Sequence, residues 1–149
     1  MRVTRASLDD LGDVAPLFDA YRQFYGQPSD VAAARAFLEE RLRRDESVIF
    51  LARASEPSGE PLGFTQLYPS FSSVSLRRLW ILNDLYVRSD VRRGGVGRRL
   101  LERARDWAVE TGSKGLTLAT AVTNRDAQAL YESCGWRKDE EFLHYTLLV

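Results

Sequence analysis

Residue types that carry familiar chemistry are scarce in this chain. Its 149 residues include one cysteine, Cys134, and one histidine, His144. A single cysteine excludes an intrachain disulfide and a cysteine-based zinc cage, and suits a reducing cytoplasm. A Ser-His-Asp mechanism would have to use His144, and no Gly-x-Ser-x-Gly turn is present to hold the nucleophile. We therefore expect no metal site, and a structural role for His144.

The chain also lacks a charge excess and a long apolar run. Lys+Arg and Asp+Glu both number 21, so the formal net charge is zero. This balance argues against a nucleic-acid binder that relies on a broad basic field. No apolar run is long enough to span a membrane, and Met1–Ala6 lacks the apolar core of a signal peptide. We expect a cytoplasmic protein with neither nucleic acid nor membrane as its partner.

Apolar periodicity predicts a single domain over residues 1–149. The element order predicts an α/β (α+β) fold, in which a mixed sheet of about seven strands carries helices on both faces. A loop over the site is expected at 69–78, and Ser7 and Ser29 are the expected caps of the first two helices. The expected strands are 2–6, 47–53, 62–68, 79–87, 115–122 and two within 136–149, and the expected helices begin near 11 and 30 and span 95–111 and 126–133.

The most informative motif is VRSDVRRGGVGRRLL at residues 87–101. Glycines let backbone N–H groups approach an anion, and the helix that follows directs its positive end to the same place. A P-loop is excluded because two arginines, and not Lys-Ser/Thr, follow Gly97, and a dinucleotide fingerprint fails because Leu100 replaces its third glycine. Five arginines surround the loop, and guanidinium groups pair well with phosphate. The motif predicts a phosphorylated cofactor, with a glycine-rich surface turn as the alternative.

Two motifs resemble those of the GNAT acetyltransferase superfamily. Arg92-x-x-Gly95-x-Gly97 resembles its acetyl-CoA pyrophosphate loop, Gln/Arg-x-x-Gly-x-Gly/Ala. Asn124, followed by Ala127, Leu130-Tyr131 and Gly135-Trp136, resembles its next motif, at the spacing of the family. The resemblance covers roughly residues 79–136. A narrower likeness, in 63–73 and 82–87, is to the branch with histone, polyamine and D-amino-acid acetyltransferases.

This resemblance implies a mostly antiparallel, twisted GNAT sheet and an N-acetyltransferase. Acetyl would move from acetyl-CoA to a primary amine by direct attack in a ternary complex. The amine would be a small molecule, such as an amino acid or a polyamine, or a protein lysine. The resemblance also implies a homodimer formed partly through the C-terminal strands. The implied cofactor-binding residues are Leu85, Tyr86, Val87, Arg92, Arg93, Gly94, Gly95, Val96, Gly97, Arg98, Asn124 and Tyr131.

Two residues are candidates for the catalytic groups. Tyr131 matches the acid of the family, and a phenol with a pKa near 10 is protonated at neutral pH and can protonate a leaving thiolate. Its alternative role is packing beside Leu130. Asp84 is the only carboxylate in the strand 79–87. It would act as the base, directly or through water, or bind the ammonium; its alternatives are an exposed edge position or a partner for an arginine. Asn83 points to the opposite face unless a bulge intervenes.

The acceptor pocket is the least constrained part of the site. By family analogy, aromatic residues from the first helix and the hairpin form its wall, with Gln66 nearby, and a cation–π contact would hold the amine. Packing in the core is the alternative for these aromatic residues. Two rival functions also remain open, a non-catalytic acyl-CoA sensor and a nucleotide-binding regulatory module. The predicted substrate-binding residues are Tyr21, Phe24, Tyr25, Tyr68 and Phe71.

Overall fold

A computed structural model describes residues 1–149, which form two compact units, 1–119 and 120–149. The second unit contains one helix, α4 (Arg125–Ser133). None of the helices combines the length and apolar character needed to cross a membrane. The first unit contains β1 (Arg2–Arg5), the 3-10 helix η1 (Leu8–Asp10), α1 (Leu11–Phe24), α2 (Val31–Arg43), β2 (Val48–Arg53), β3 (Pro61–Ser72), β4 (Arg77–Val87), the 3-10 helix η2 (Ser89–Val91), α3 (Val96–Glu110) and β5 (Leu116–Thr117).

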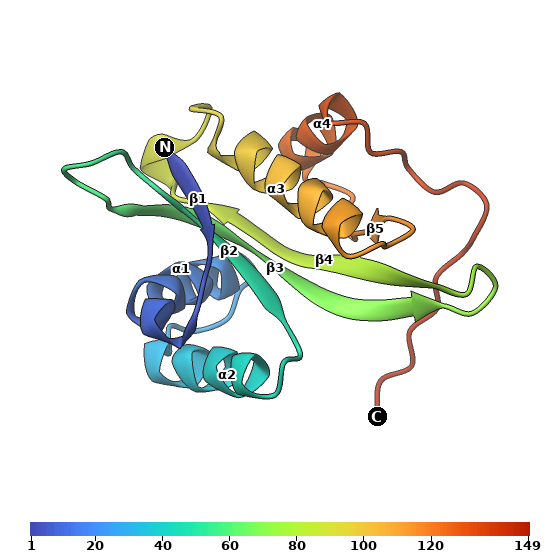
Figure 1. Cartoon of the computed structure of the whole chain (residues 1–149), viewed down its shortest axis with the longest axis horizontal. Helices are drawn as coiled ribbons and strands as arrows, with labels where there is room; N and C mark the ends of the chain where they lie inside the picture. The colour runs from blue at the N-terminus through green and yellow to red at the C-terminus, as the bar shows by residue number, and fades with distance from the viewer. The chain divides into compact units, whose positions relative to one another are not determined.

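The first unit is built on a mixed sheet with the strand order β1-β2-β3-β4-β5. The first four strands are antiparallel to their neighbours, and β5 runs parallel to β4. Helices α1 and α2 cover one face of the sheet, and α3 covers the other (Figure 1). The expected α+β class and the mixed sheet are confirmed, but the sheet has five strands and not about seven.

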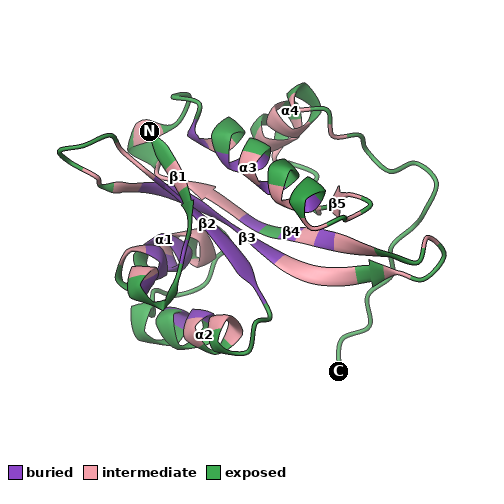
Figure 2. Cartoon of the chain, in the orientation of Figure 1, coloured by how far each residue is buried: buried purple, intermediate pink, exposed green.

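The core lies on both faces of the central strands, because helices cover both. Ile49 and Leu51 of β2 pack with Phe64 of β3 in the cluster under α1 and α2. Their neighbour Phe50 points the other way, and its ring centroid lies 6.0 Å from that of Trp107 on α3. A strand covered on both sides reads as a continuous apolar run. Figure 2 accordingly shows β2 and the adjoining part of β3 as buried.

Local capping signals fix where the first helices begin. The predicted capping box is confirmed: the Ser7 hydroxyl accepts from the backbone N–H of Asp9, while an Asp10 carboxylate oxygen accepts from the Ser7 N–H. The predicted cap of the second helix was wrong. Asp30 caps α2 by accepting from the Ala33 N–H at 3.0 Å. Ser29 instead donates its hydroxyl to buried Asp19 of α1, and so ties the turn between α1 and α2 to α1.

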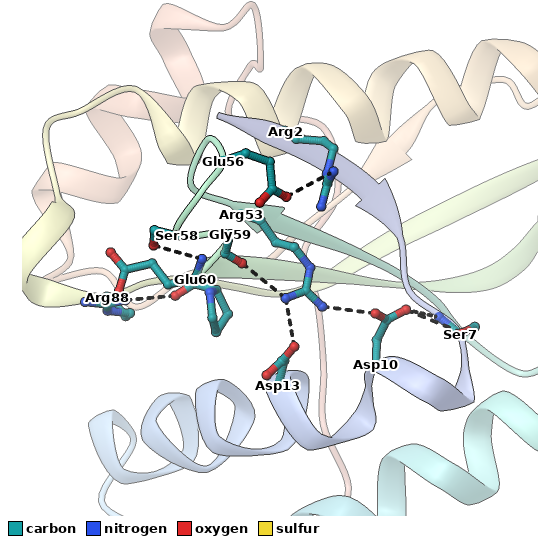
Figure 3. A network of polar contacts seen from close by, with 11 residues as sticks. Arg2, Ser7, Asp10, Asp13, Arg53, Glu56, Ser58, Gly59, Glu60 and Arg88 are labelled. Atoms are coloured by element: carbon teal, nitrogen blue, oxygen red, sulfur yellow. Dashed lines mark hydrogen bonds and ion pairs between the residues drawn. The ribbon is translucent and has the colours of Figure 1, made fainter.

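One ion cluster joins the end of β2 to the start of α1 (Figure 3). The Arg53 guanidinium lies 3.0 Å from an Asp10 carboxylate oxygen and 2.7 Å from one of Asp13, and it also donates to the carbonyl of Gly59. These two carboxylates raise the pKa of Arg53, with the Asp13 hydrogen bond as the largest cause. We call this group the Arg53 cluster. Its charges are satisfied within the chain.

The expected loop over residues 69–78 was wrong. Strand β3 continues to Ser72, and β4 begins at Arg77, so that Ser72 pairs with Arg77 across a tight turn. Four serines made the segment read as irregular, but residues at a solvated hairpin end gain their order from the ladder. The irregular part is confined to residues 73–76.

The last strands were also predicted wrongly. The strand expected at 115–122 is limited to Leu116–Thr117, and residues 134–149 contain no strand. The apolar pattern remains visible, since Phe142, Leu143 and Tyr145 are strongly exposed. A strand requires a hydrogen-bonded neighbour as well as a suitable pattern. This segment has the pattern and lacks the neighbour.

Candidate functional site

The glycine motif forms the connection from β4 to α3. Arg93 (φ 68°) and Gly95 (φ 83°) both adopt left-handed conformations. Gly95 is the N-cap of α3 and offers no side chain to it, and the first helical bond runs from the Arg99 N–H to the Gly95 carbonyl at 3.1 Å. The amides ahead of Arg99 therefore have no acceptor within the helix, and the positive end of the helix lies beside them. A Cβ at Gly95 would meet no atom within 4 Å, so this end is open and fits a phosphate.

The arginines around this loop differ in their availability. Arg88 lies 3.1 Å from a Glu60 carboxylate oxygen and also pairs with Asp90, and these bonds raise its pKa. It is therefore occupied within the chain and does not belong to the group expected to face phosphate. Arg92 and Arg93 are both exposed, and Arg92 also donates to the Val87 carbonyl at 3.0 Å.

The end of β4 approaches β3 unusually closely. Gly63 pairs with Val87. A Cβ on Gly63 would lie 2.5 Å from the carbonyl oxygen of Tyr86, a distance that side chains do not tolerate. The glycine thus permits the observed spacing of the two strands. The side chain of Tyr86 packs against the core beneath α1 and α2. This contact anchors the segment Leu85–Val87.

A β-bulge interrupts β4 at Asn83. Leu82 pairs with Leu67 and Asp84 pairs with Gln66, so Asn83 has no partner across the ladder. The extra residue changes which side chains face α1 and α2. As a result Asp84 lies on that face. Side chains hold the bulge in place: the Tyr21 hydroxyl donates to the Asn83 carbonyl at 3.3 Å, and the Thr65 hydroxyl donates to the Asp84 carbonyl at 2.8 Å.

Asp84 is a buried carboxylate with neutral partners. It is 3% exposed. Gln66 Nε2 donates to one carboxylate oxygen, and Asn83 Nδ2 donates to the other at 3.0 Å. Burial raises the pKa of Asp84 above its usual range, against the opposing effect of its hydrogen bonds with Gln66, Asn83 and Tyr21. It forms no ion pair with a lysine or arginine. We call Asp84, Gln66, Asn83, Tyr21 and Tyr68 the Asp84 cluster.

Gln66 was placed near the pocket by the sequence, but its bond to Asp84 was not predicted. The other amide atom, Oε1, is buried and has no hydrogen-bond partner. Turning the amide over would set that oxygen against the carboxylate, so the bond to Asp84 fixes its orientation. The partnership depends on the register set by the bulge, and no local pattern reports it.

Two tyrosines complete this group. Burial is the main cause that raises the pKa of Tyr68 to about 12, and the negative charge of Asp84 adds to it. The pKa of Tyr21 is also raised, again chiefly by burial and then by Asp84. Both phenols are therefore protonated at neutral pH, and that of Tyr21 donates to the Asn83 carbonyl.

The predicted aromatic wall is only partly assembled. At the end of α1, the ring centroids of Tyr21 and Tyr25 lie 5.0 Å apart, and those of Phe24 and Tyr25 lie 5.3 Å apart. Phe24 and Tyr25 are 60% and 50% exposed, so these two are surface residues and not core. Phe71 lies elsewhere. It lines a cavity with Trp80 and Trp107, on the face covered by α3.

The second unit contains the other motif. Asn124 Oδ1 accepts from the Ala127 N–H at 3.2 Å and thereby caps α4. Tyr131 is half-buried, and its ring centroid lies 6.1 Å from that of Trp136. The backbone N–H of Trp136 donates to the Tyr131 carbonyl, and Gly135 ends the helix in a left-handed conformation (φ 90°). The motif thus forms a short capped helix whose last turn carries Tyr131.

Comparisons with known proteins agree with these features. The profile of the acetyltransferase (GNAT) family matches residues 14–136. An N-acetyltransferase of Bacillus subtilis, YhfO, is 50% identical over 149 residues, which cover 100% of this chain and 98% of the relative. A probable acetyltransferase of Haemophilus influenzae is 31% identical and covers 92% of this chain and 90% of its own length.

A solved structure extends the comparison to the fold. The crystal structure of a probable acetyltransferase superposes with a TM-score of 0.95 at 52% identity, covering 100% of this chain and 98% of the other. The relative is thus similar to this chain in fold as well as in sequence.

Proposed function

This chain belongs to the acetyltransferase (GNAT) family and is an N-acetyltransferase, and from that premise we propose acetyl-CoA as its donor and a primary amine as its acceptor. The observation that carries the proposal is the buried Asp84 carboxylate without a cation. A buried charge is costly unless it is paired. An ammonium group brought by the substrate supplies the missing charge.

The glycine loop supports acetyl-CoA as the donor. The pyrophosphate of the cofactor matches the open, positive end of α3 at Gly95. Bound there, acetyl-CoA supplies an acetyl group activated as a thioester. Backbone groups of Leu85–Val87 orient its arm, and Asn124 adds a side-chain contact. The loop residues proposed to contact the phosphates are Arg92, Arg93, Gly94, Gly95, Val96, Gly97 and Arg98.

The Asp84 cluster supports the amine as the acceptor. Two buried groups of this cluster can each take a further partner: the Asp84 carboxylate has neutral donors but no cation, and Gln66 Oε1 has no hydrogen-bond donor. An ammonium has three donors and satisfies both. Tyr21, Phe24, Tyr25 and Tyr68 then provide aromatic surface for the rest of the amine, which is a small molecule or a lysine side chain. Phe71 is not part of this surface.

The reaction balances with these groups. The ammonium gives a proton to Asp84, directly or through water, and the freed lone pair attacks the acetyl carbon. The new C–N bond forms as the C–S bond breaks. Tyr131 donates its phenolic proton to the departing thiolate. The attacking nitrogen loses its second proton, which restores the Tyr131 phenol, and Asp84 releases its proton to solvent. The products are an N-acetyl amide and CoA, and no covalent acyl-enzyme is required.

We also propose that the two units act together as one domain over 1–149, and that the protein is a cytoplasmic homodimer. The support for the dimer is an exposed apolar segment, with Phe142, Leu143, Leu147 and Leu148 each at least 70% exposed. Strand β5 ends the sheet order, so one of its edges is unpaired. Such edges and patches attract another chain. Light scattering at roughly tens of micromolar protein, a usual in-vitro concentration, tests the dimer. A measured mass of 16.9 kDa, that of one chain, would contradict it.

The test of function is CoA release from acetyl-CoA across a panel of amines. We expect turnover with at least one amine, and a drop of roughly 10²–10⁴ in Tyr131→Phe, the usual weight of one acid–base group. Tyr131→Phe keeps the ring, so its melting temperature and CoA affinity stay unchanged. Wild-type turnover in this variant, with chemistry rate-limiting, would remove Tyr131 from the mechanism.

Calorimetry tests the donor separately. Gly95→Glu places a negative side chain where the phosphate binds and should abolish CoA binding. Val109→Glu adds the same charge on the exposed far end of α3 and serves as the control. CoA binding without turnover on any amine would favour the sensor, and binding of ATP or NAD in place of CoA would favour the regulatory module.

A further inference from the structure

A cavity of about 590 Å³ lies on the face of the sheet covered by α3. It is remote from the Asp84 cluster, which faces α1 and α2. Its lining combines aromatic rings with basic and hydroxyl groups, a mixture that the proposed acetyl transfer does not use. The residues that define it are Arg5, Ser47, Phe71, Arg78, Trp80 and Trp107.

Two polar atoms in this lining lack partners. Ser47 Oγ and Trp107 Nε1 are buried and make no hydrogen bond, and Ser47 as a whole is 3% exposed. The neighbouring indole, that of Trp80, does donate, to the Thr111 hydroxyl at 2.8 Å. Buried polar groups are nearly always satisfied, so each exception needs an explanation. Two exceptions in one cavity point to an acceptor group supplied from outside the chain.

The charges in the cavity point to the same ligand. The Arg5 guanidinium lies 4.7 Å from the centroid of the Trp107 ring, and that of Arg78 lies 5.3 Å from the centroids of Phe71 and Trp80. Neither guanidinium forms an ion pair within the chain, although Asp45 also lines the cavity. Stacked guanidinium groups without carboxylates retain their capacity to bind an anion.

We propose that this cavity binds a small aromatic monocarboxylate. The ligand carboxylate accepts from Trp107 Nε1 and Ser47 Oγ and lies near Arg5 and Arg78. Its ring packs against the aromatic side chains, which favour flat apolar groups. Asp45 disfavours a ligand with several negative charges, such as a nucleotide. The site is independent of acetyl transfer, because it involves neither the glycine loop nor Asp84.

The test uses the full chain labelled with ¹⁵N and titrated with 4-fluorobenzoate. The protein has three tryptophans, so three indole N–H signals report, and Trp→Phe variants assign them. We expect a saturable shift of the Trp107 signal, because its N–H gains an acceptor, and no shift of Trp136, which does not line the cavity. Neutral 4-fluorobenzamide and cationic 4-fluorobenzylamine should bind at least about 10-fold more weakly, because they lack the charge that the arginines recognise.

Variants place the carboxylate within the cavity. Arg78→Gln and Ser47→Ala should each weaken 4-fluorobenzoate binding by roughly 10-fold, the effect of losing one charge-assisted or buried hydrogen bond. If Ser47→Ala does not fold, Arg5→Gln, which removes the other guanidinium of the cavity, takes its place and should also weaken binding. Arg43→Gln, an exposed arginine of α2 outside the cavity, is the matched control and should leave the affinity unchanged. The absence of a saturable Trp107 shift, equal binding of the benzamide, or an unchanged affinity in Arg78→Gln would each overturn the proposal.

Discussion

The Asp84 cluster and the Arg53 cluster treat charge in opposite ways. Arg53 lies within 3.0 Å of two carboxylates, so its positive charge is more than matched inside the chain. Asp84 is more deeply buried, yet its partners are neutral amides and a phenol. Both groups join α1 to the sheet, and both are networks of polar side chains.

The difference separates structure from function. A charge whose partner is already present contributes to folding and has no need of a ligand. A buried charge without a counter-ion raises the free energy of the folded chain and persists where it serves another purpose. The comparison therefore favours a stabilising role for the Arg53 cluster and supports the proposed role of the Asp84 cluster in substrate binding and catalysis.

The largest expected effect comes from Asp84→Asn. Turnover should fall by roughly 10²–10⁴, because the amide can neither accept the proton nor balance the ammonium. The melting temperature should stay the same or rise, since a buried charge is removed. The measurement is CoA release at saturating acetyl-CoA, with Arg43→Gln, an exposed arginine of α2, as a control that leaves the Asp84 cluster intact. Wild-type turnover in Asp84→Asn would make Asp84 a structural residue like Arg53.

Arg53→Gln should show the reverse pattern. Its loss leaves Asp10 and Asp13 without their cation, and we expect the free energy of unfolding to fall by about 1–2 kcal/mol, the scale of a partly shielded charged hydrogen bond. Turnover per folded molecule should remain unchanged. Urea unfolding followed by fluorescence checks this, with Arg43→Gln as the exposed-pair control at less than about 0.5 kcal/mol. A loss of turnover in folded Arg53→Gln would contradict a purely stabilising role for the Arg53 cluster.

The pH dependence gives a smaller effect. The pKa of Asp84 is raised in the folded protein, so the folded state holds its proton to a higher pH than the unfolded chain does. Stability should therefore decline as the pH rises from the unfolded pKa of about 3.9 through the folded pKa. The acid limb of kcat/KM should rise over the same window, as the base ionises. Asp84→Asn should abolish this part of the stability change, and an identical pH–stability curve in that variant would contradict the shift.

The smallest effect is expected from Tyr68→Phe. With its pKa raised to about 12, Tyr68 stays neutral wherever the enzyme is assayed. The variant should therefore leave the alkaline side of the activity profile unchanged up to about pH 10, the ordinary pKa of a phenol. Stability should change by less than about 0.5 kcal/mol, as for most partly exposed substitutions. An alkaline limb that disappears in Tyr68→Phe would give this phenol a titrating role.

Signals that operate within a few residues were predictable from the sequence. The Ser7 capping box and the helix that follows the glycine loop each depend on a short stretch of chain. The glycine motif and the motif at residues 124–136 together predicted the family from the sequence, and the family is confirmed. The roles of Tyr131 and of the loop residues in binding and catalysis stay predictions.

Features that depend on distant partners were not predictable. The bond from Gln66 to Asp84 requires the register between β3 and β4, which no single segment encodes. Family analogy placed Phe71 in the acceptor wall, but its side chain lies on the other face of the sheet. The face that Phe71 occupies also depends on that register, which the sequence does not show. The strands expected beyond Trp136 failed for a related reason. An apolar pattern states what a segment is able to pair with, and not whether a neighbour is present.

The bulge at Asn83 reverses which residues of β4 face each side of the sheet. Before it, Trp80 contacts α3. After it, Asp84 and Tyr86 are directed toward α1, although all three positions are even. The location of the carboxylate is thus set by counting residues as well as by their chemistry. If Asn83 instead took the regular place opposite Gln66, an intact Asp84 would face α3. Homologous enzymes that place a carboxylate here should therefore accept many substitutions in this strand and still keep the bulge.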